Sequence, residues 1–531
     1  MRPHGPWTAA LLLLWLAALL LLLPPGVPLP LRDWDEGIVA RVALERAMAL
    51  AHGDGLPSLL LPTYWGQAYL NKPPGLHLLM APLLLPWLGA DGPPPPAVVR
   101  LVPALAASAV VPLAALISRE LNPADRRGAL ATAVVTLTLL PLMRHGRLAM
   151  LDGALVSAQG LLWWQLLRAR RQSFWAPLLA GLAGSGLLLL KGPVLLPTLA
   201  AGLALLALER PSTLRWRPLL LALLLGLLPG LAWHGLHGWS RGAAALVQWG
   251  GDGATRVLLG RGEGSDLGWR LPLLKVLEGG WPWLPLWPFA MAWAWRRRQQ
   301  AQGLWPLGLQ LAMALAVLPL RTQLPWYSHP LWLPFALLTG PLLAALVADP
   351  RLPGVPGAPV LRRLPWFWAL LGGLLLAASA ALPNARLLLP PAGLGLLLGG
   401  LALARPAAAW RRWGALLLAA GWWGSLLALL QSPHWHWELN ERAPVGPAVA
   451  LARQAAPADP LALWQQSERP SLSWGAGRRL LPLARTSTPA GATLQLLSQG
   501  PGPVPTPAGH RCRLAASDQD GWRLWRCPAV P

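Results

Sequence analysis

Three acidic residues stand together near the start of the chain, in the stretch LRDWDEG that begins at residue 31. Asp33, Asp35 and Glu36 lie within four positions, although the 531 residues include only 21 Asp and Glu against 44 Lys and Arg. Asp33 can cap a helix, with Glu36 three positions later completing a capping box, and acids in a first turn also suit the helix dipole. Capping does not need a third acid, which leaves Asp35 as a candidate general base beside a membrane.

Lysine, arginine and a second acid recur in short polar segments between the apolar runs. Lys72 precedes two prolines in NKPPG, and Asp152 follows Arg144 and Arg147 in RHGRLAMLDG. The other members of this set are Lys191 in LKGP, Arg256 and Arg261 in TRVLLGRGEG, and Arg321 and Tyr327 in LRTQLPWYSHP. For any one cation, a side chain that reaches from a helix end to lipid headgroups is a sufficient explanation. Together they predict a site for an anionic lipid phosphate beside a carboxylate base, because ionisable groups at membrane depth are costly and often functional.

Long apolar runs must position these segments, and they predict a polytopic membrane protein. Apolar residues form 54% of the sequence and charged residues 12%, with a mean hydropathy of +0.44, whereas about 25% charge is typical of soluble proteins. Runs of roughly 17–25 apolar residues predict about thirteen spans, from 7–23 to 412–430. Prolines rather than a small-residue cleavage site follow the first run, so we expect it to remain as an uncleaved span. The 33 Trp suit anchoring at the membrane interfaces.

The apolar run 73–89 decides the predicted topology. If it crosses the membrane, every later loop changes side, and four basic clusters lie outside: 126–127, 168–171, 296–298 and 362–363. Lys and Arg concentrate in cytoplasmic loops, so the sequence favours a re-entrant or interfacial helix at 73–89, and the prolines in this run fit that reading. This topology places the first loop, 24–96, and the tail after residue 430 on the outer face.

The tail 431–531 is rich in proline and more polar than the rest, and it contains both cysteines, Cys512 and Cys527. A disulfide suits an oxidising outer face, and two unpaired thiols are the alternative, because spacing alone cannot show their geometry. The segments ATLQLLS and GWRLWRCP have strand character, which predicts a small mixed α/β domain here. The predicted domains are therefore a membrane domain over 1–430 and an extracytoplasmic domain over 431–531.

The formal net charge of +23 does not indicate a nucleic-acid partner. The basic residues cluster in short loops between spans, where anionic lipid headgroups are a sufficient partner. No Gly-rich dinucleotide or Walker-type loop is found, so no nucleotide site is predicted. The letters HWHWE at 434–438 include His434, His436 and Glu438 but lack further ligands for a metal.

Seven of these segments occur in one order over about residues 1–335: DE, KPP, RLAMLD, KGP, TR, PWLPLWP and LPWYSHP. In this order the chain resembles the GT-C glycosyltransferases that use polyprenyl-phosphate sugars. The resemblance is to the bacterial branch that includes the lipid A aminoarabinose transferases, which is related to the dolichyl-phosphate-mannose protein mannosyltransferases. It implies an all-α membrane bundle, with interfacial helices in the first outer loop and a small C-terminal α/β domain.

The resemblance also implies roles for the residues. The catalytic acid maps to Asp35, with Glu36 beside it, and a second acidic position maps to Asp152. The expected donor-phosphate-binding residues are Lys72, Lys191, Arg256, Arg321 and Tyr327. Asn71 stands where many relatives have a Glu that helps hold a metal ion, so no cofactor is expected with certainty and a divalent metal ion stays an open alternative. Gln323 stands where a second Lys is frequent.

The predicted function is an inverting transfer of a sugar from a polyprenyl-phosphate donor to a lipid A, protein or surface-glycan acceptor. It would take place on the periplasmic face of an inner membrane. A membrane transporter of a lipid-linked or anionic substrate is the alternative. Transporters often show repeated halves with ionisable groups near the midplane, whereas here the ionisable residues stand at the predicted outer ends of spans.

Overall fold

The computed structural model describes residues 5–23, 30–31, 34–90, 92–171, 174–246, 267–321, 323–432, 434, 445–486, 491–500 and 502–530. The chain divides into two compact units. The first, here the helical unit, contains residues 1–26, 70–76 and 101–435. The second, here the mixed unit, contains residues 27–69, 77–100 and 436–531, so that parts of the first loop and the tail form one body. The domain boundaries drawn from chain order stay a prediction.

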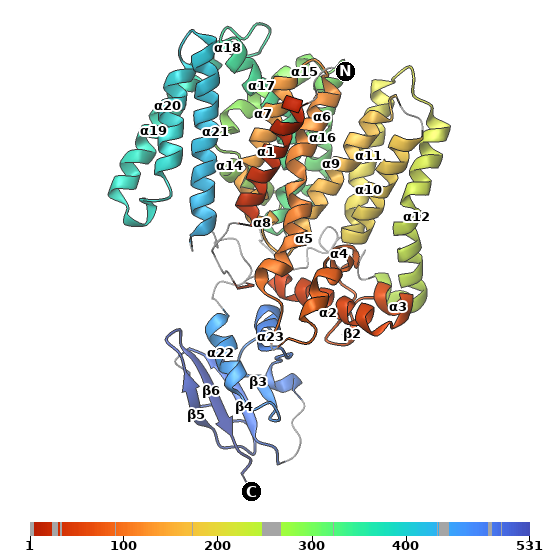
Figure 1. The fold of residues 1–531 in the computed structure, drawn as a ribbon, viewed down its shortest axis with the longest axis vertical. Coiled ribbons are helices and arrows are strands. Elements are labelled where there is room, and N and C mark those ends of the chain that lie inside the picture. Colours follow the sequence, from red (N-terminus) through yellow and green to blue (C-terminus); the bar gives the residue numbers. More distant parts are fainter. Residues whose placement is uncertain are drawn as a thin grey trace. The chain divides into compact units, whose positions relative to one another are not determined.

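The helical unit consists of helices that run roughly side by side (Figure 1). Leu and Ala, both strong helix formers, dominate them, and Pro stands in the first turn of several, where its missing N–H costs no hydrogen bond. The helices are α1 (Gly5–Leu22), α5 (Pro96–Ser108), α6 (Val110–Leu121), α7 (Arg126–Leu137), α8 (Leu140–Gly146), α9 (Asp152–Arg168), α10 (Trp175–Lys191), α11 (Leu195–Glu209), α12 (Trp216–Arg241), α14 (Arg270–Gly279), α15 (Trp287–Arg296), α16 (Ala301–Val317), α17 (Trp332–Ala348), α18 (Ala358–Leu361), α19 (Leu364–Ala381), α20 (Pro390–Leu403) and α21 (Ala408–Gln431). Short 3-10 turns join them at η2 (Gly192–Val194), η3 (Gly242–Leu246), η5 (Leu284–Leu286), η6 (Pro325–Leu331) and η7 (Pro383–Ala385).

Among the described residues, six helical stretches are long and apolar enough to cross a membrane, and a seventh results if α7 and α8, bent by 58°, form one span. One of the six, 175–209, contains both α10 and α11. A straight helix of that length would extend about 50 Å, yet Arg170 Nη1 lies 2.9 Å from Glu209 Oε1. The chain therefore folds back at η2, and α10 and α11 are antiparallel. The expected helical membrane fold is confirmed, whereas the count of thirteen spans is not.

Two glycines allow α10 and α12 to pack closely. A Cβ atom at Gly181 would lie 2.2 Å from the carbonyl oxygen of Leu223, and one at Gly226 would lie 2.2 Å from that of Leu178. Small residues at such crossings let helix backbones approach one another in a membrane. This contact sets α10, which ends at Lys191, against α12.

Two buried tryptophans of the helical unit, Trp163 and Trp283, donate their indole N–H groups to other segments of the unit. Trp163 of α9 is fully buried and donates its Nε1–H to the Thr198 carbonyl of α11 at 3.0 Å. Trp283, also buried, donates to Thr138 Oγ1 at 2.8 Å. Each ring buries a large apolar area while its polar edge finds a partner, so the first of these bonds holds α9 and α11 in fixed register.

The mixed unit begins with α2 (Trp34–His52), α3 (Gly55–Leu60) and a hairpin of β1 (Thr63–Tyr64) and β2 (Gln67–Ala68). Apolar helix α4 (Gly75–Leu84) follows and continues as η1 (Leu85–Trp87). Thirteen helical residues extend about 20 Å, less than the roughly 30 Å of a bilayer core. This length supports the prediction that the run at 73–89 does not cross the membrane. The capping role expected of Asp33 lies outside the described residues.

The tail forms the predicted small α/β domain. Its elements are α22 (Gly446–Gln454), β3 (Leu461–Leu463), α23 (Pro470–Ala476), η9 (Leu483–Arg485), β4 (Leu494–Gln499), β5 (Arg513–Ser517) and β6 (Trp522–Cys527). The strands form one sheet in the order β3-β4-β6-β5, in which β3 is parallel to β4 and the other pairs are antiparallel. The two segments predicted as strands coincide with β4 and β6. One core lies between the sheet and the two helices, with Leu472, Leu497 and Trp522 at its centre.

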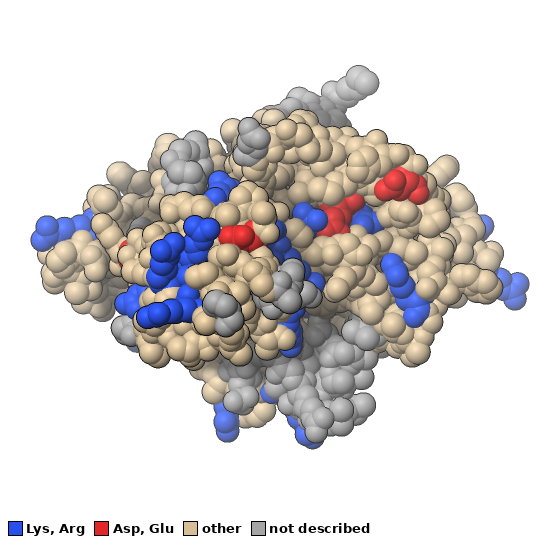
Figure 2. Space-filling view, turned by 90° about the horizontal axis from the view of Figure 1, so that it is seen from below, with Lys and Arg blue, Asp and Glu red and all other residues tan. Residues whose placement is uncertain are grey.

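Basic side chains gather on the surface drawn in Figure 2, where few acidic ones interrupt them. In the tail domain the exposed arginines include Arg511, Arg513 and Arg526, and Arg513 stands directly opposite Arg526 across β5 and β6. Like charges facing each other across two strands repel. A surface of this kind is compatible with the anionic lipid headgroups expected as membrane partners.

Cys512 and Cys527 form a disulfide in the tail domain. Cys512 directly precedes β5 and Cys527 is the last residue of β6, so the bond closes the end of the β5–β6 pair that lies away from the turn. The structure thus contains the bonded form of the two alternatives left open by the sequence.

Removal of this bond by Cys512→Ala with Cys527→Ala should lower the free energy of unfolding of the tail domain. The bond closes a loop with a sequence separation of 15 residues, and constraint of an unfolded loop of that size contributes about 3 kcal/mol. Thermal unfolding of the full chain in detergent, followed by near-ultraviolet circular dichroism, measures the change. Wild type treated with reductant is the control and should behave like the double variant, and an unchanged midpoint in both would contradict the expectation.

Candidate functional site

A cavity of about 190 Å³ lies within the helical unit. Its walls come from the segment 71–73, from α9, from the fold-back between α10 and α11, from α12, from α16 and from η6. Segments that are far apart in the sequence therefore meet around one space. Four of the residues predicted for the site line it: Lys72, Asp152, Lys191 and Tyr327.

One face of α9 forms a wall of this cavity. Asp152, Leu155, Val156 and Gln159 all line it, at the spacing of three and four residues that places side chains on one side of a helix. Asp152 is the first residue of α9, where a carboxylate interacts favourably with the helix dipole. The helix thus presents an acid at one end of the cavity and an amide two turns further along.

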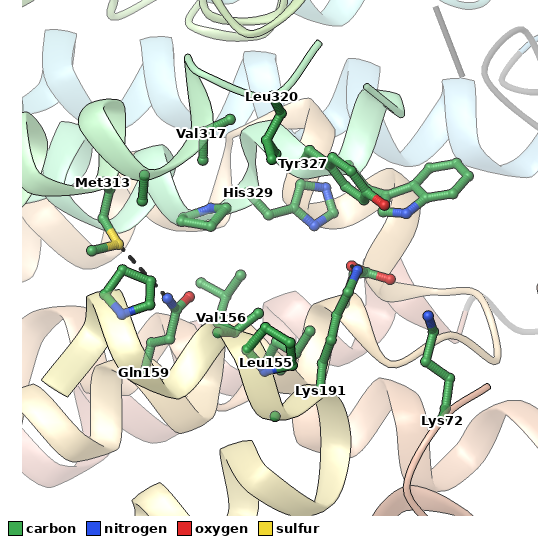
Figure 3. Close-up of a pocket in the computed structure, with 18 of the residues that line it drawn as sticks. Lys72, Leu155, Val156, Gln159, Lys191, Met313, Val317, Leu320, Tyr327 and His329 are labelled. Carbon is green, nitrogen blue, oxygen red and sulfur yellow. Dashed lines mark hydrogen bonds and ion pairs between the residues drawn. The ribbon is translucent and has the colours of Figure 1, made fainter. Parts of the chain in front are cut away.

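Lys191 is central to the charged end of the cavity. Its Nζ lies 3.9 Å from Asp152 Oδ1 and 4.6 Å from the ring centroid of Tyr327. Lys72 enters from the segment before α4, and its Nζ lies 3.2 Å from Asn71 Oδ1. Figure 3 shows Lys72 and Lys191 at the same end as Tyr327, with their amino groups directed toward the space between the walls. With two ammonium groups and one carboxylate, this end carries an excess positive charge suited to an anion.

The far end of the cavity is mostly apolar. Met313 and Val317 of α16 face Leu155 and Val156 of α9 across it (Figure 3). Gln159 is the polar exception, and its Nε2 donates to Thr198 Oγ1 at 2.9 Å, which fixes the amide. A cavity that is charged at one end and apolar at the other suits a ligand that joins a phosphate to a hydrocarbon chain.

The lining also includes residues that were not predicted from the sequence, among them Gln159, His234, Met313, Trp326 and His329. Gln159 could have been found, because it stands seven positions after Asp152 on a predicted helix. His329 and Trp326 flank Tyr327 in the segment already singled out. His329 Nε2 lies 3.1 Å from His145 Nδ1, a pairing of residues 184 positions apart that no local pattern indicates.

Of the other two predicted phosphate-binding residues, the structure describes only Arg321. Arg321 is exposed between α16 and η6 and is not part of the cavity lining. Arg256, with Arg261, lies outside the described residues. Gln323, which stands where relatives often have Lys, is fully buried and donates its amide to the carbonyls of Val317 and Leu320, both at 3.0 Å.

Asp35 and Glu36, two of the three acids in the opening stretch, lie in the first turn of α2 in the mixed unit. Asp35 is half-buried there. Glu36 is fully buried and pairs with Arg100: Oε1 accepts from Nε at 2.7 Å, and Oε2 accepts from an Nη at 2.8 Å. Since both carboxylate oxygens of Glu36 are engaged, its geometry is that of a structural ion pair, and its predicted part in catalysis gains no support from these contacts.

The described residues contain no group of three or more His, Cys, Asp or Glu side chains placed to hold a metal ion. The Asn71 amide oxygen accepts from Lys72 Nζ at 3.2 Å. Of the metal-like letters at 434–438, His436 and Glu438 lie outside the described residues. No step of the chemistry below uses a metal ion.

Comparison with known proteins gives the site a context. The family model described as dolichyl-phosphate-mannose-protein mannosyltransferase matches residues 92–228. ArnT from Cupriavidus metallidurans, in the crystal structure bound to undecaprenyl phosphate, is similar to the chain with a TM-score of 0.71 and 18% identity, over 99% of this chain and 98% of that one. Its apo structure gives a TM-score of 0.68 and 16% identity, over 98% and 97% of the two chains. No curated protein matches the sequence.

A more distant likeness extends to the archaeal oligosaccharyltransferase AglB from Archaeoglobus fulgidus, with a TM-score of 0.53 and 13% identity, over 93% of this chain and 69% of that one. The fold shared with these structures and the family match confirm the resemblance to the GT-C glycosyltransferases. The structural matches show that the chain has the fold of these membrane proteins over nearly its whole length.

Glu36→Gln should destabilise the protein by about 3 kcal/mol, because removal of one member of a buried ion pair leaves the other charge without compensation. The measurement is the thermal midpoint in detergent, with Glu120→Gln as the comparison, because Glu120 pairs with the partly buried Arg170 and the exposed Arg171. The Arg100→Met variant should be destabilised in the same way. A Glu36→Gln protein of wild-type stability that has lost activity would instead show that Glu36 acts in the reaction.

Proposed function

We propose that this protein transfers a sugar from a polyprenyl-phosphate donor to an acceptor hydroxyl or phosphate on the outer face of the membrane, with inversion at the anomeric carbon. The single observation that carries this proposal is the cavity in which Lys72, Lys191, Tyr327 and Asp152 meet at one end of an apolar space. The ArnT of similar fold from Cupriavidus metallidurans has a crystal structure bound to undecaprenyl phosphate, a ligand with the same division between charge and hydrocarbon.

The donor half of the reaction follows from the charges. When the bond between the anomeric carbon and the phosphate oxygen breaks, the departing lipid phosphate gains negative charge. The ammonium groups of Lys72 and Lys191 stabilise that charge, because they stand in place before it develops. Asp152 keeps Lys191 oriented from 3.9 Å, and the Tyr327 ring lies against the ammonium group. The isoprenoid chain occupies the apolar end.

The acceptor half is assigned to Asp35. Its carboxylate removes or orients the acceptor proton, so that the acceptor oxygen attacks the anomeric carbon from the side opposite the phosphate. One displacement of this kind inverts the anomeric centre, and the acceptor proton passes to Asp35. The assignment is supported by the family resemblance and by the position of Asp35 in a first helical turn that also holds a buried ion pair. Lipid A, a protein hydroxyl and a surface glycan are the acceptor classes to be compared.

The inner membrane and its periplasmic face are the proposed location. The disulfide between Cys512 and Cys527 supports an oxidising compartment for the tail domain. The basic clusters at 126–127, 168–171, 296–298 and 362–363 support the opposite face for the loops that contain them. The transporter alternative has less support, because the charged groups gather at one end of the cavity rather than along a path through the bundle.

Lys191→Gln should weaken binding of undecaprenyl phosphate by about tenfold or more, the value of one charge-assisted contact. Fluorescence-detected titration of the purified protein with the lipid measures the dissociation constant. Lys275→Gln is the matched control, since Lys275 belongs to α14 and pairs with Glu278 outside the cavity lining. Equal effects of the two changes would remove Lys191 from the phosphate site.

Asp35→Asn should abolish sugar transfer while leaving donor binding within about twofold of wild type, because loss of a general base affects the chemical step. The assay supplies radiolabelled polyprenyl-phosphate sugars and membrane extract, and follows label as it leaves the lipid. Asp54→Asn, an exposed acid of the same loop, is the control. If Asp35→Asn transfers sugar at the wild-type rate, Asp35 has only a structural role in the first turn of α2. If the wild-type protein binds donor but transfers none of the sugars, the proposed function is contradicted.

A further inference from the structure

The helical turn that carries Asp35 packs against the tail domain within the mixed unit. A Cβ atom at Gly37 would lie 2.3 Å from the backbone nitrogen of Ser471 and 2.4 Å from the carbonyl carbon of Pro470. Real Cβ atoms do not approach backbone atoms so closely. The start of α23 therefore touches the backbone of α2 two residues after Asp35, with no side chain between them.

Gly37 is costly for the helix that contains it, because glycine is the least favourable helix residue apart from proline. An alanine would stabilise α2 if the surface were open. The close approach of Pro470 and Ser471 explains why a glycine stands there. The glycine thus lowers the intrinsic helix propensity of α2, but it allows the first turn of α2 to contact the tail domain.

The same turn is held on another side by Arg100. Besides the two bonds to Glu36, an Nη group of Arg100 donates to the Pro30 carbonyl at 2.9 Å. Arg100 belongs to α5, and Pro30 precedes α2 in the chain. The residue next to Asp35 and the segment before it are therefore anchored by one buried guanidinium.

A second contact joins the tail domain to the hairpin that follows α2. Arg479 forms two bonds to Glu468, Nε to Oε1 at 3.0 Å and Nη2 to Oε2 at 3.2 Å, and its Nη1 donates to Gln67 Oε1 at 3.2 Å. The guanidinium also lies 5.2 Å from the ring centroid of Tyr64. Burial, and then the Glu468 carboxylate, raise the pKa of Tyr64 above its ordinary value. The phenol therefore keeps its proton and donates to Glu468 at 3.4 Å.

The hairpin in turn is bonded to α2. Arg46 donates to the Leu61 carbonyl at 2.9 Å and to Thr63 Oγ1 at 2.6 Å, and Thr63 donates to Glu45 Oε2 at 2.5 Å. Arg41 stacks 3.7 Å from the Trp65 ring centroid. The hairpin therefore connects the tail domain to the middle of α2. The contact at Gly37 connects the tail domain to the first turn of the same helix.

We propose that the tail domain is a positioning element for the reaction, which holds α2 at Gly37 and at the Tyr64 hairpin so that the Asp35 carboxylate stays in its working orientation. The inference rests on the proposed function, in which Asp35 acts on the acceptor. Gly37, Glu468 and Arg479 are positioning residues: they act through α2, and none of them lines the proposed donor cavity.

The test compares Gly37→Ala with Gly446→Ala in the full chain. Gly446 begins α22 in the same unit, and a Cβ atom there would meet no atom within 4 Å. Gly37→Ala should lower kcat by about 10- to 100-fold, as expected for a misplacement of about 1 Å at a reacting group, with an undecaprenyl phosphate dissociation constant within about twofold of wild type. Gly446→Ala should match wild type in both. Arg479→Ala should repeat the Gly37→Ala pattern more weakly, against exposed Arg485→Ala as its control.

Hydrogen–deuterium exchange gives a readout that does not depend on transfer. In Gly37→Ala, amides of 34–45 should exchange faster than in wild type, while those of α9 and α10 keep wild-type rates. Equal kcat and equal exchange in the Gly37 and Gly446 variants would overturn the inference. A general loss of thermal stability with donor binding reduced together with kcat would also overturn it. A wild type without transfer would contradict the proposed function, whereas unchanged exchange at α2 contradicts only the positioning role.

Discussion

The cost of burying charge is the constraint on which this structure depends. Ionised groups taken from water must find partners, or the fold loses several kcal/mol for each. Arg411 shows the rule away from the site: it is nearly fully buried, and its guanidinium donates to the carbonyls of Val347 and Ala348 at 2.9 Å, where α17 ends. Glu36 and Arg100 follow the same rule in the mixed unit. In both places the charge serves to join two helices or to end one.

The cavity departs from this pattern. Lys191 and Asp152 are 3.9 Å apart, compared with 2.7 Å for Glu36 and Arg100. A pair at the shorter distance saturates both partners, whereas the looser pair leaves donor capacity on the ammonium group for a further anion. The apolar neighbours of the pair, among them Leu155 and Pro193, keep the local dielectric low, so that an anion entering there would be bound more strongly than at an exposed lysine. The structural pair and the cavity pair therefore both join a carboxylate to a cation, but at different separations.

Much of this arrangement could be predicted from the sequence, since it depends on local order. The position of Asp152 at the start of a helix, the short apolar helix after KPPG and the strands β4 and β6 all follow from patterns of fewer than twenty residues. The meeting of Lys72, Lys191 and Tyr327 followed from family resemblance rather than from periodicity. The bond between His145 and His329 could not be found in this way, because it depends on how η6 packs on α8.

Two further features were beyond the reach of sequence patterns. In the sequence, Gly37 is an unfavourable residue within a helix. Its reason is the backbone of Pro470, which lies beside it in the structure but more than four hundred residues later in the chain. The grouping of the first loop with the tail has the same origin: shape complementarity between distant segments leaves no periodic trace. The fold-back between α10 and α11 was easier to predict, because Lys191 interrupts the apolar run at that point.

The opposite directions of α9 and α10 have an electrostatic consequence. Lys191 ends α10, where unpaired carbonyl groups give the helix a partial negative charge, and Asp152 begins α9, where unpaired amides give a partial positive charge. The charge of each side chain is therefore partly compensated by the peptide groups at its own helix end. It is also compensated by the oppositely charged side chain of the other helix. Two neighbouring helices that run in opposite directions thus separate a positive and a negative pole at one level of the bundle. The charged end of the cavity therefore contains two opposite charges, 3.9 Å apart, that are each partly compensated by a helix end before any substrate arrives.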